Sequence, residues 1–590
     1  MTAGRWFSVL FLVLAQSGVA FAADAGANAT NETAAIEPAP VSLRVLSEED
    51  AARYLEIFEI QEDGRWNDAD MLIGALENDI LLGYVQYQRY MHPTAYRSSF
   101  AELKRWMSYY ADHPEADKVY ALARKRQPKG QSSPVRPVPR KWRAEQEKEL
   151  HPDLIADYER TGRSTLRRIE GRTRFLSNKE RALEAKREND AHLKRGTITE
   201  RQYDRMTSWI AASLYYQGYI DAAEEMAKAA AERNGDTAVL AYWIAGLIDF
   251  RKGDVGAAFE QFNAMAAVPY QEDSLRAAAG FWAARTALGA GQPAAVTSNL
   301  EIAAEFPFTF YGQLALAQLG RAQQYNWTPP SLSQHQFDEL IEDQPRIMRA
   351  IALAEAGMTS EADLELRWAN GSLAEEQSPH LLAVAMALDL PAAQIDIALS
   401  SDDPALEAGL FPVPHYAPES GFKIDRALLY ALMRQESKFK TDATSRVGAR
   451  GLMQLMPRTA SYIAKDRSLR NRTGRERLYD PAYNMELGQN YVGYLIDGAA
   501  DGDLFNLAAA YNGGPGNLRR WKRDVEIEDP LLFIESIPNR ESRDFVEKVL
   551  TNFWVYRARL GQPAPSREEV AAGRLPLYEA VDQIAGQSAQ

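Results

Sequence analysis

Hydrophobic residues recur at helical spacing along most of this chain. Between about residues 43 and 126, apolar positions follow one another at three- and four-residue steps, as in Leu76, Ile80 and Tyr84. A second, Ala-rich stretch from about residue 150 to 399 is almost wholly helical in pattern. This periodicity predicts an all-α protein. Residues 127–140 interrupt it with four prolines among Gly, Ser and basic residues, which predicts a linker or surface loop.

The second helical stretch repeats itself at intervals of 34 and 39 residues. In each repeat we expect a tryptophan to open a helix that ends at a glycine-centred turn, after which two alanines follow. The residues are Trp209, Trp243 and Trp282, followed by Gly218, Gly253 and Gly291. Such intervals suit helix-turn-helix units of the tetratricopeptide type, which stack into a superhelix. Taken alone, this stretch predicts a generic helical-repeat scaffold.

The start of the sequence is typical of a secretory signal. Arg5 precedes an apolar run, and Ala20-Phe21-Ala22 gives the small-x-small pattern that signal peptidase reads. We therefore expect a signal peptide at 1–22, with cleavage after Ala22, and a disordered spacer at 23–40. The apolar run is shorter than the ~20 residues of a permanent transmembrane helix, so we expect no membrane anchor.

A chain of 590 residues is too long for one hydrophobic core. Pro412 and Pro414 interrupt the helical pattern a second time, so we expect a helical region at 41–410 and a separate domain at 411–590. The net charge of -14 and the pI near 5.3 argue against a nucleic-acid binder. The sequence has no cysteine, no HExxH motif and no His/Cys cluster, so we predict neither a metal site nor a cofactor.

The stretch from residue 427 to 460 carries the candidate chemistry. Leu428, Leu432 and Met433 predict a helix from about Arg426, which Asp425 is placed to cap, and which ends near residues 435–437. Glu436 is then a carboxyl at a helix C-terminus near apolar residues, and both features favour the neutral acid. Such an acid can protonate a glycosidic oxygen. On periodicity alone, however, Glu436 is better interpreted as a solvated surface residue.

Three ordered motifs change this interpretation. They are Glu436-Ser437-x-Phe439 with Ala443-x-Ser445-x-x-Gly448-Ala449-x-Gly451-Leu452-Met453-Gln454-Leu455-Met456-Pro457-x-Thr459-Ala460, then Ala509-Ala510-Tyr511-Asn512-x-Gly514-Pro515-Gly516, and Glu535-Ser536-Ile537-Pro538-x-x-Glu541-Ser542-Arg543-x-Phe545-Val546. Together they resemble the soluble lytic transglycosylases, which have a goose-type-lysozyme-like catalytic domain. Gly513 stands where Ala is more usual, which would loosen the turn. Ser542 and Phe545 replace the more frequent Thr and Tyr.

The resemblance implies a periplasmic enzyme that acts on peptidoglycan glycan strands. It implies cleavage of the β-1,4 bond between N-acetylmuramic acid and N-acetylglucosamine by the muramyl 6-hydroxyl, which leaves a 1,6-anhydromuramyl end. Glu436 would act first as acid and then as base. The implied substrate contacts are Ser445, Gln454, Met456, Tyr491, Tyr511 and Glu541. In this family the helical region bends into a ring or horseshoe, and here it could also recruit other cell-wall enzymes.

Several alternatives stay open at this point. A lysozyme-like hydrolase would need a second carboxylate, but Asp442 and Asp480 are better explained as a turn residue and a helix cap. A non-catalytic envelope scaffold would use the repeats alone. Met456 fits a hydrophobic core as well as a cleft, and Glu541 could instead pair with Arg543 or meet a stem peptide. Asn512 could serve only as a helix-end cap.

Overall fold

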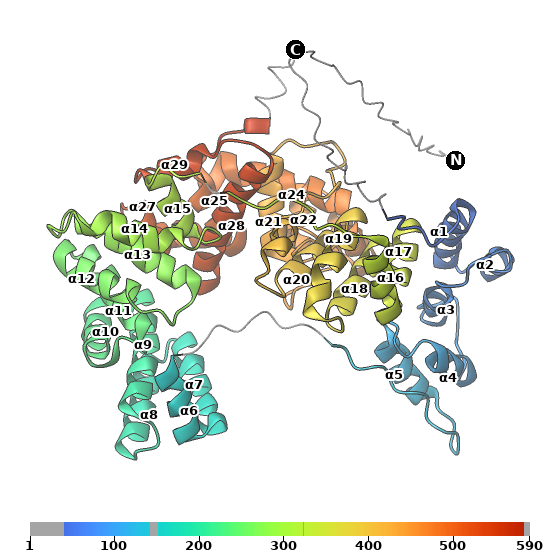
Figure 1. Cartoon of the computed structure of the whole chain (residues 1–590), viewed down its shortest axis with the longest axis horizontal. Coiled ribbons are helices and arrows are strands. Elements are labelled where there is room, and N and C mark those ends of the chain that lie inside the picture. Colours follow the sequence, from blue (N-terminus) through green and yellow to red (C-terminus); the bar gives the residue numbers. More distant parts are fainter. Residues whose placement is uncertain (1–40, 142–150, 323, 583–590) are drawn as a thin grey trace, which may run out of the picture. The chain divides into compact units, whose positions relative to one another are not determined.

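Helices dominate the part of the chain that the computed structural model describes, namely residues 41–141, 151–322 and 324–582 (Figure 1). Across these ranges, the β-structure consists of three isolated bridges, which pair Thr444 with Arg450, Arg450 with Leu455, and Asp503 with Leu577. The all-α prediction is therefore confirmed. None of the helices in these ranges is long and apolar enough to span a membrane. The predicted signal peptide at 1–22 and spacer at 23–40 lie outside the described residues.

Five helices form the first helical segment: α1 (Glu48–Glu62), α2 (Trp66–Ile73), α3 (Leu82–Tyr90), α4 (Phe100–Tyr109) and α5 (Ala116–Arg126). Local capping explains where α4 begins. The Ser99 hydroxyl accepts from the Glu102 N–H at 3.2 Å, and the Glu102 carboxylate accepts from the Ser99 N–H at 2.6 Å. The segment after α5, predicted as a linker at 127–140, is irregular and largely exposed.

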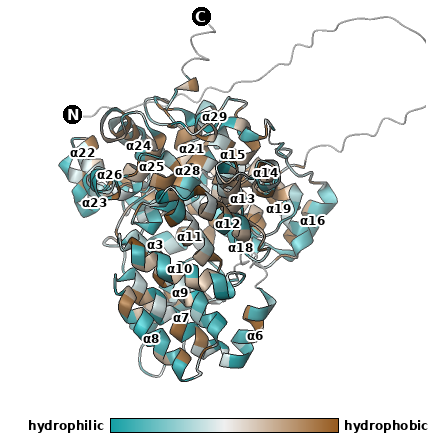
Figure 2. Cartoon of the chain, turned by 90° about the vertical axis from the view of Figure 1, so that its left-hand side faces the viewer, coloured by the Kyte–Doolittle hydropathy of each residue, from teal (hydrophilic) through white to brown (hydrophobic). Residues whose placement is uncertain are grey.

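Ten helices form the repeat segment: α6 (Pro152–Thr161), α7 (Arg163–Asn178), α8 (Ala182–Lys194), α9 (Glu200–Tyr216), α10 (Ile220–Asn234), α11 (Val239–Arg251), α12 (Val255–Ala266), α13 (Asp273–Ala287), α14 (Ala295–Ala304) and α15 (Phe310–Gln318). Consecutive helices pack against each other, as the repeat interpretation predicts. Figure 2 shows hydrophobic and hydrophilic residues interspersed along these helices, and buried apolar residues of α7 to α15 share one core.

The turn glycines of the repeats lie where the sequence predicts, but the tryptophans do not. Gly218, Gly253 and Gly291 follow α9, α11 and α13 with φ of +84°, +82° and +71°, a left-handed conformation that favours glycine. Trp282, however, lies in the second half of α13 rather than opening it. Its ring meets Trp243 of α11 at 6.2 Å between centroids. Trp243 and Trp282 therefore fill the space between two successive units.

A third segment joins the first one across a long stretch of sequence. It contains α16 (Gln334–Asp343), α17 (Arg346–Glu355), α18 (Thr359–Asn370), α19 (Ser378–Ala387) and α20 (Pro391–Ala398). Residues of α1 and α3 share one hydrophobic core with these helices. The Tyr84 hydroxyl of α3 donates to Glu365 of α18 at 2.7 Å, and the Leu46 N–H donates to Glu355 of α17 at 2.8 Å.

Nine further helices follow Pro414: α21 (Arg426–Ser437), α22 (Pro457–Ile463), α23 (Arg472–Glu476), α24 (Pro481–Leu495), α25 (Leu504–Gly513), α26 (Pro515–Val525), α27 (Pro530–Glu535), α28 (Arg540–Arg559) and α29 (Pro565–Ala571). The central pair is α21 and α28, which pack along each other. Their apolar residues join the core of the repeat segment. This region presents the motifs singled out in the sequence.

Candidate active site

Glu436 lies in the last turn of α21, as the sequence predicts. The turn that follows is held in an uncommon conformation, because Lys438 and Phe439 have φ of +50° and +60°. Phe439 is buried, and the Ser437 hydroxyl donates to the Met433 and Leu452 carbonyls at 3.1 and 2.8 Å. These contacts fix the end of α21 against the loop that contains Leu452. Glu436, in this last turn, is half-buried.

The predicted cap of α21 is wrong. The Asp425 side chain does not bond the first amides of the helix. Instead it accepts from Arg557 Nη2 at 2.6 Å and from the Val581 and Asp582 N–H groups at 3.1 and 3.0 Å. The Arg426 N–H donates to the Asp582 carboxylate at 2.8 Å. A residue far along the chain therefore caps the helix, which local sequence spacing cannot reveal.

The loop between α21 and α22 follows Glu436 in the sequence and is held by several close contacts. Gly451 has φ of +74°, and a Cβ there would lie 2.1 Å from the Leu478 carbonyl oxygen, so no other residue fits. The Asn484 side chain of α24 accepts from the Met453 N–H at 2.8 Å and donates to the Leu478 carbonyl at 2.8 Å. This loop is held by buried hydrogen bonds rather than by regular secondary structure.

Two of the predicted substrate contacts are part of this bracing. The Gln454 amide nitrogen donates to the Ala443 and Gly451 carbonyls at 3.1 and 2.9 Å. The Ser445 hydroxyl accepts from the Ala449 N–H at 3.0 Å. The structure thus gives both residues a role in shaping the loop.

Met456 differs from its apolar neighbours in its exposure to solvent. Leu452 and Met453 are fully buried, whereas 39% of Met456 is exposed. The structure therefore places Leu452 and Met453 in the core and Met456 at the surface, where a ligand can reach it.

Tyr491 and Tyr511 lie together, although they come from α24 and α25. Their ring centroids are 5.4 Å apart, and both rings are half-buried. The Tyr511 hydroxyl donates to the Met453 carbonyl at 2.8 Å, and its ring stacks on Phe545 at 6.1 Å. Because Phe545 packs by its ring, a hydroxyl at that position is not needed for this contact.

The start of α28 meets the end of α25 through polar side chains. Asn512 donates to the Glu541 carboxylate at 3.3 Å and accepts from the Ser542 hydroxyl at 2.6 Å. Asn512 is therefore more than a helix-end cap. The guanidinium of Arg543 lies over the Tyr216 ring at 3.4 Å and donates to the Ile537 carbonyl. The alternative in which Glu541 pairs with Arg543 is not seen.

Gly513 has a packing role that the sequence did not indicate. It is the last residue of α25, and a Cβ there would lie 2.3 Å from the Trp521 ring. Trp521 is buried, so the glycine makes room for a large side chain of α26.

Burial raises the pKa of Glu436 to about 8, and the negative charge of Glu541 adds to the rise. At neutral pH the carboxyl is therefore mostly protonated, as the sequence predicts. Neither neighbouring carboxylate resembles a catalytic partner. Asp480 caps α24 by accepting from the Tyr483 N–H at 2.7 Å, and Asp442 is an exposed turn residue. The site thus offers one neutral acid among aromatic side chains.

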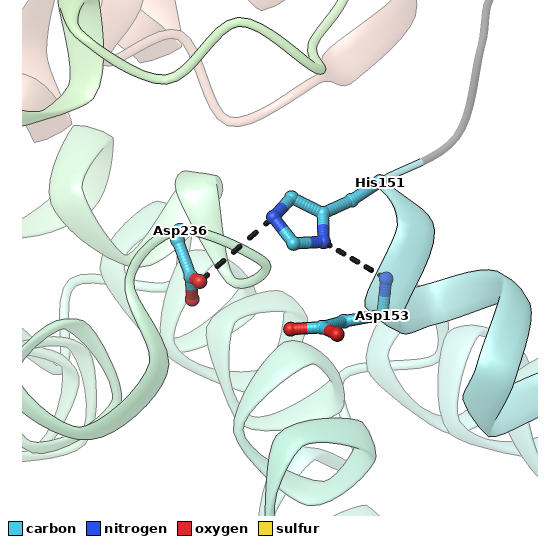
Figure 3. Close-up of side chains that lie close together, drawn as sticks. All are labelled: His151, Asp153 and Asp236. Atoms are coloured by element: carbon cyan, nitrogen blue, oxygen red, sulfur yellow. Dashed lines mark hydrogen bonds and ion pairs between the residues drawn. The ribbon is translucent and has the colours of Figure 1, made fainter.

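One group of metal-type ligands occurs among the described residues, far along the chain from Glu436. His151, Asp153 and Asp236 bring their ligand atoms within 4.8 Å of one another (Figure 3). However, His151 Nδ1 accepts from the Asp153 N–H at 3.2 Å, so the proton of the neutral ring lies on Nε2, facing Asp236. Asp153 also pairs with Arg201 at 3.3 Å. These contacts describe a helix cap better than a metal site.

The tertiary structure also brings together residues that the sequence does not single out. Tyr462 and Tyr494 extend the aromatic pair of Tyr491 and Tyr511. Tyr494 lies three residues after Tyr491 on the same face of α24, and this spacing could have indicated it from the sequence. No local pattern marks Tyr462.

The fold is similar to those of solved structures. The chain matches the crystal structure of the 70 kDa soluble lytic transglycosylase Slt70 from Escherichia coli with a TM-score of 0.53 and 18% identity, over 87% of this chain and 97% of that one. A similar match, with a TM-score of 0.53 and 17% identity, is the complex of the 70 kDa enzyme with bulgecin A. The architecture is therefore an N-terminal helical superhelix followed by a lysozyme-like α domain.

Comparison of sequences is more specific. Residues 416–533 match the family model "Transglycosylase SLT domain". The soluble lytic murein transglycosylase of E. coli K12 is 37% identical over 143 residues, which cover 24% of this chain and 22% of that protein. A putative soluble lytic murein transglycosylase of Haemophilus influenzae is 32% identical over 151 residues, 25% of each chain. The C-terminal part of this chain is therefore similar to transglycosylase SLT domains, and the alignments span about a quarter of these relatives.

Proposed function

We propose that this chain is an exported, periplasmic lytic transglycosylase that cleaves the glycan strands of peptidoglycan. The observation that supports this most directly is Glu436, a carboxylic acid with a pKa of about 8, set beside tyrosine rings in the domain matched at 416–533. The relatives with this domain are named for the same activity on murein. We assign the reaction to a domain at 411–590, and a supporting role to the helical region at 41–410.

In the first step, Glu436 donates its proton to the glycosidic oxygen between N-acetylmuramic acid and N-acetylglucosamine. The bond between that oxygen and the muramyl anomeric carbon breaks, and the N-acetylglucosamine leaves with a free 4-hydroxyl. General acid catalysis of this kind contributes roughly 10²- to 10⁴-fold. It requires the neutral acid at working pH, which the burial of Glu436 provides.

In the second step, the muramyl 6-hydroxyl attacks the anomeric carbon of its own ring, and the Glu436 carboxylate takes the hydroxyl proton. The product is a 1,6-anhydromuramyl end, no water is consumed, and Glu436 returns to its acid form. One carboxyl group suffices because the nucleophile belongs to the substrate and is already close to its target. This agrees with the roles of Asp442 and Asp480 as a turn residue and a cap.

The substrate contacts divide into two groups in this proposal. Met456, Tyr491 and Tyr511 offer apolar faces to the sugar rings, and Glu541 offers a carboxylate to hydroxyl, amide or stem-peptide groups. Ser445 and Gln454 chiefly hold the loop, and Gln454 meets the substrate through its amide oxygen, because its nitrogen is used within the loop.

Digestion of purified peptidoglycan by the mature chain tests this function. Muropeptides are analysed by mass spectrometry before and after borohydride reduction. We expect wild type to release anhydro-muropeptides that borohydride does not reduce, and Glu436→Gln to release none. Asp442→Asn and Asp480→Asn serve as matched controls that retain the activity.

Other outcomes point to the alternatives. Reducible ends, together with loss of activity in either aspartate variant, would replace the transglycosylase by a lysozyme-like hydrolase. An intact sacculus with wild type would favour a scaffold that binds glycan or other cell-wall enzymes without cleaving.

A further inference from the structure

A row of tyrosine rings leads from the candidate site to the protein surface. It begins at Tyr511, which lies close enough to Glu436 for a charge on Glu436 to raise the pKa of the phenol. From there the centroid distances are 5.4 Å to Tyr491, 6.4 Å from Tyr491 to Tyr494, and 5.8 Å from Tyr494 to Tyr462. The four rings come from α25, α24 and α22, so only the tertiary fold brings them into one row.

The outer two rings of this row are exposed. Tyr462 is 62% exposed and Tyr494 is 48% exposed, whereas Tyr491 and Tyr511 are half-buried. A single exposed tyrosine on a protein surface is ordinary. Here two exposed rings touch each other, meet nearly at right angles with 72° between their planes, and continue the row from the site. Because both rings are so exposed, packing in the hydrophobic core does not explain why two tyrosines lie here.

We propose that Tyr462 and Tyr494 form an outer saccharide subsite, which binds sugar residues of the glycan strand beyond those held at Glu436. This inference rests on the proposed function and extends it. A pyranose ring presents a flat set of C–H groups that packs on an aromatic face, while its hydroxyls can hydrogen-bond the phenol oxygen. The ring-to-ring steps are also comparable to the length of one sugar residue.

A glycan strand fits this surface better than a protein partner does. The row is continuous with the candidate site through Tyr491, so a strand in the site reaches the outer rings without a second binding event. Tyr462 lies on α22, which packs against α24, and this support fixes the two rings relative to the site. The outer pair would therefore favour long strands over short ones.

A binding experiment tests the subsite without relying on catalysis. The full chain carrying Glu436→Gln is titrated with size-fractionated glycan strands from which the stem peptides have been removed. Adding Tyr462→Ala and Tyr494→Ala together should weaken binding of long strands about tenfold, which corresponds to about 1.4 kcal/mol, because two aromatic anchors are lost. Binding of a disaccharide should not change. Tyr219→Ala, which removes an equally exposed tyrosine (61%) at the start of α10, is the matched control and should have no effect.

Kinetics on the same strands separates this inference from the proposed function. In the active chain, the double variant should raise KM for long strands with kcat unchanged, and Tyr462→Trp with Tyr494→Trp should restore it. Unaltered binding and KM in the double variant would overturn the subsite, even if wild type cleaves. Conversely, if wild type cleaves nothing but the double variant still loses affinity, the subsite stands and the proposed function fails.

Discussion

Glu436 and Glu541 lie on different helices, α21 and α28, yet the charge of one acts on the other. Burial is the larger cause of the raised pKa of Glu436, and the nearby carboxylate of Glu541 is the second. Both effects penalise the ionised form. The raised pKa of Glu436 therefore depends on where α21 ends and on Glu541 in the first turn of α28.

The pH dependence of the reaction should report this coupling. Because Glu436 must be protonated to act as an acid, kcat/KM should fall as the pH rises above about 8. Glu541→Gln removes the negative charge, lowers the pKa of Glu436 and should move this alkaline limb to lower pH. The measurement is the pH profile of kcat/KM on soluble strands for both proteins. An alkaline limb that does not move would show that the charge of Glu541 does not act on Glu436.

The start of α21 depends on a buried ion pair between elements. Asp425 and Arg557 are each about 1% exposed, and their side chains meet at 2.6 Å. Asp425 also accepts from the backbone of residues 581 and 582, so it ties together α21, α28 and the end of the described chain. A buried pair adds little net stability, but breaking one partner leaves an uncompensated charge.

Arg557→Met should therefore be strongly destabilising, by about 3 kcal/mol, since it leaves Asp425 buried without its cation. Adding Asp425→Asn should recover much of this loss, because the remaining amide is neutral. Thermal unfolding of wild type, the single variant and the double variant measures both effects. Equal losses in the single and double variants would mean that packing of the Arg557 stem, rather than its charge, is what matters.

At the scale of the whole molecule, the repeat helices contact the helices that follow Pro414. Tyr311 of α15 donates to Glu535 of α27 at 2.5 Å, and Arg285 of α13 pairs with Asp529 at the start of α27. Elsewhere Ser360 of α18 meets Thr441, in the turn after Glu436, at 2.6 Å. The helical region thus contacts α27 and the turn that follows Glu436. It also contacts α28, which carries Glu541, because the Arg543 guanidinium lies over the Tyr216 ring of α9.

A buried acid pair at this junction should make stability depend on pH. Burial raises the pKa of both Glu535 and Glu547. The charge of Glu535 raises the pKa of Glu547 further, whereas a hydrogen bond from Glu547 partly offsets the rise at Glu535. A raised pKa gives stability that is complete below about 4.5, the ordinary value, and that is lost as the pH rises through the folded-state values. The melting temperature should therefore fall between pH 5 and 8, roughly.

Glu547→Gln tests this dependence, because the amide stays neutral and should flatten the decline in melting temperature. Glu568→Gln, at an exposed position of α29, is the matched control and should leave the slope unchanged. A wild-type melting temperature that is constant over this range would contradict the buried pair.

Much of the fold and part of the site could be predicted from local sequence. Apolar periodicity indicates the helices, the repeat interval indicates their stacking, and the motif around Glu436 places the acid at the end of α21. The tryptophan positions and the cap of α21 were predicted wrongly. In both cases a partner distant in the sequence decided the outcome, namely a neighbouring repeat unit for Trp282 and Asp582 for the first amide of α21.

The sequence by itself determined which residues can do chemistry and which segments are helical, because side-chain type and 3.6-residue periodicity are local properties. The sequence indicated that Glu436 favours the neutral acid, but the tertiary structure decided how far its pKa rises, since this depends on burial and on Glu541 about a hundred residues away. It also decided that Gln454 and Ser445 brace a loop, and that four tyrosines form a row. Burial, charge proximity and ring contact are properties of the folded chain, and no local pattern encodes them.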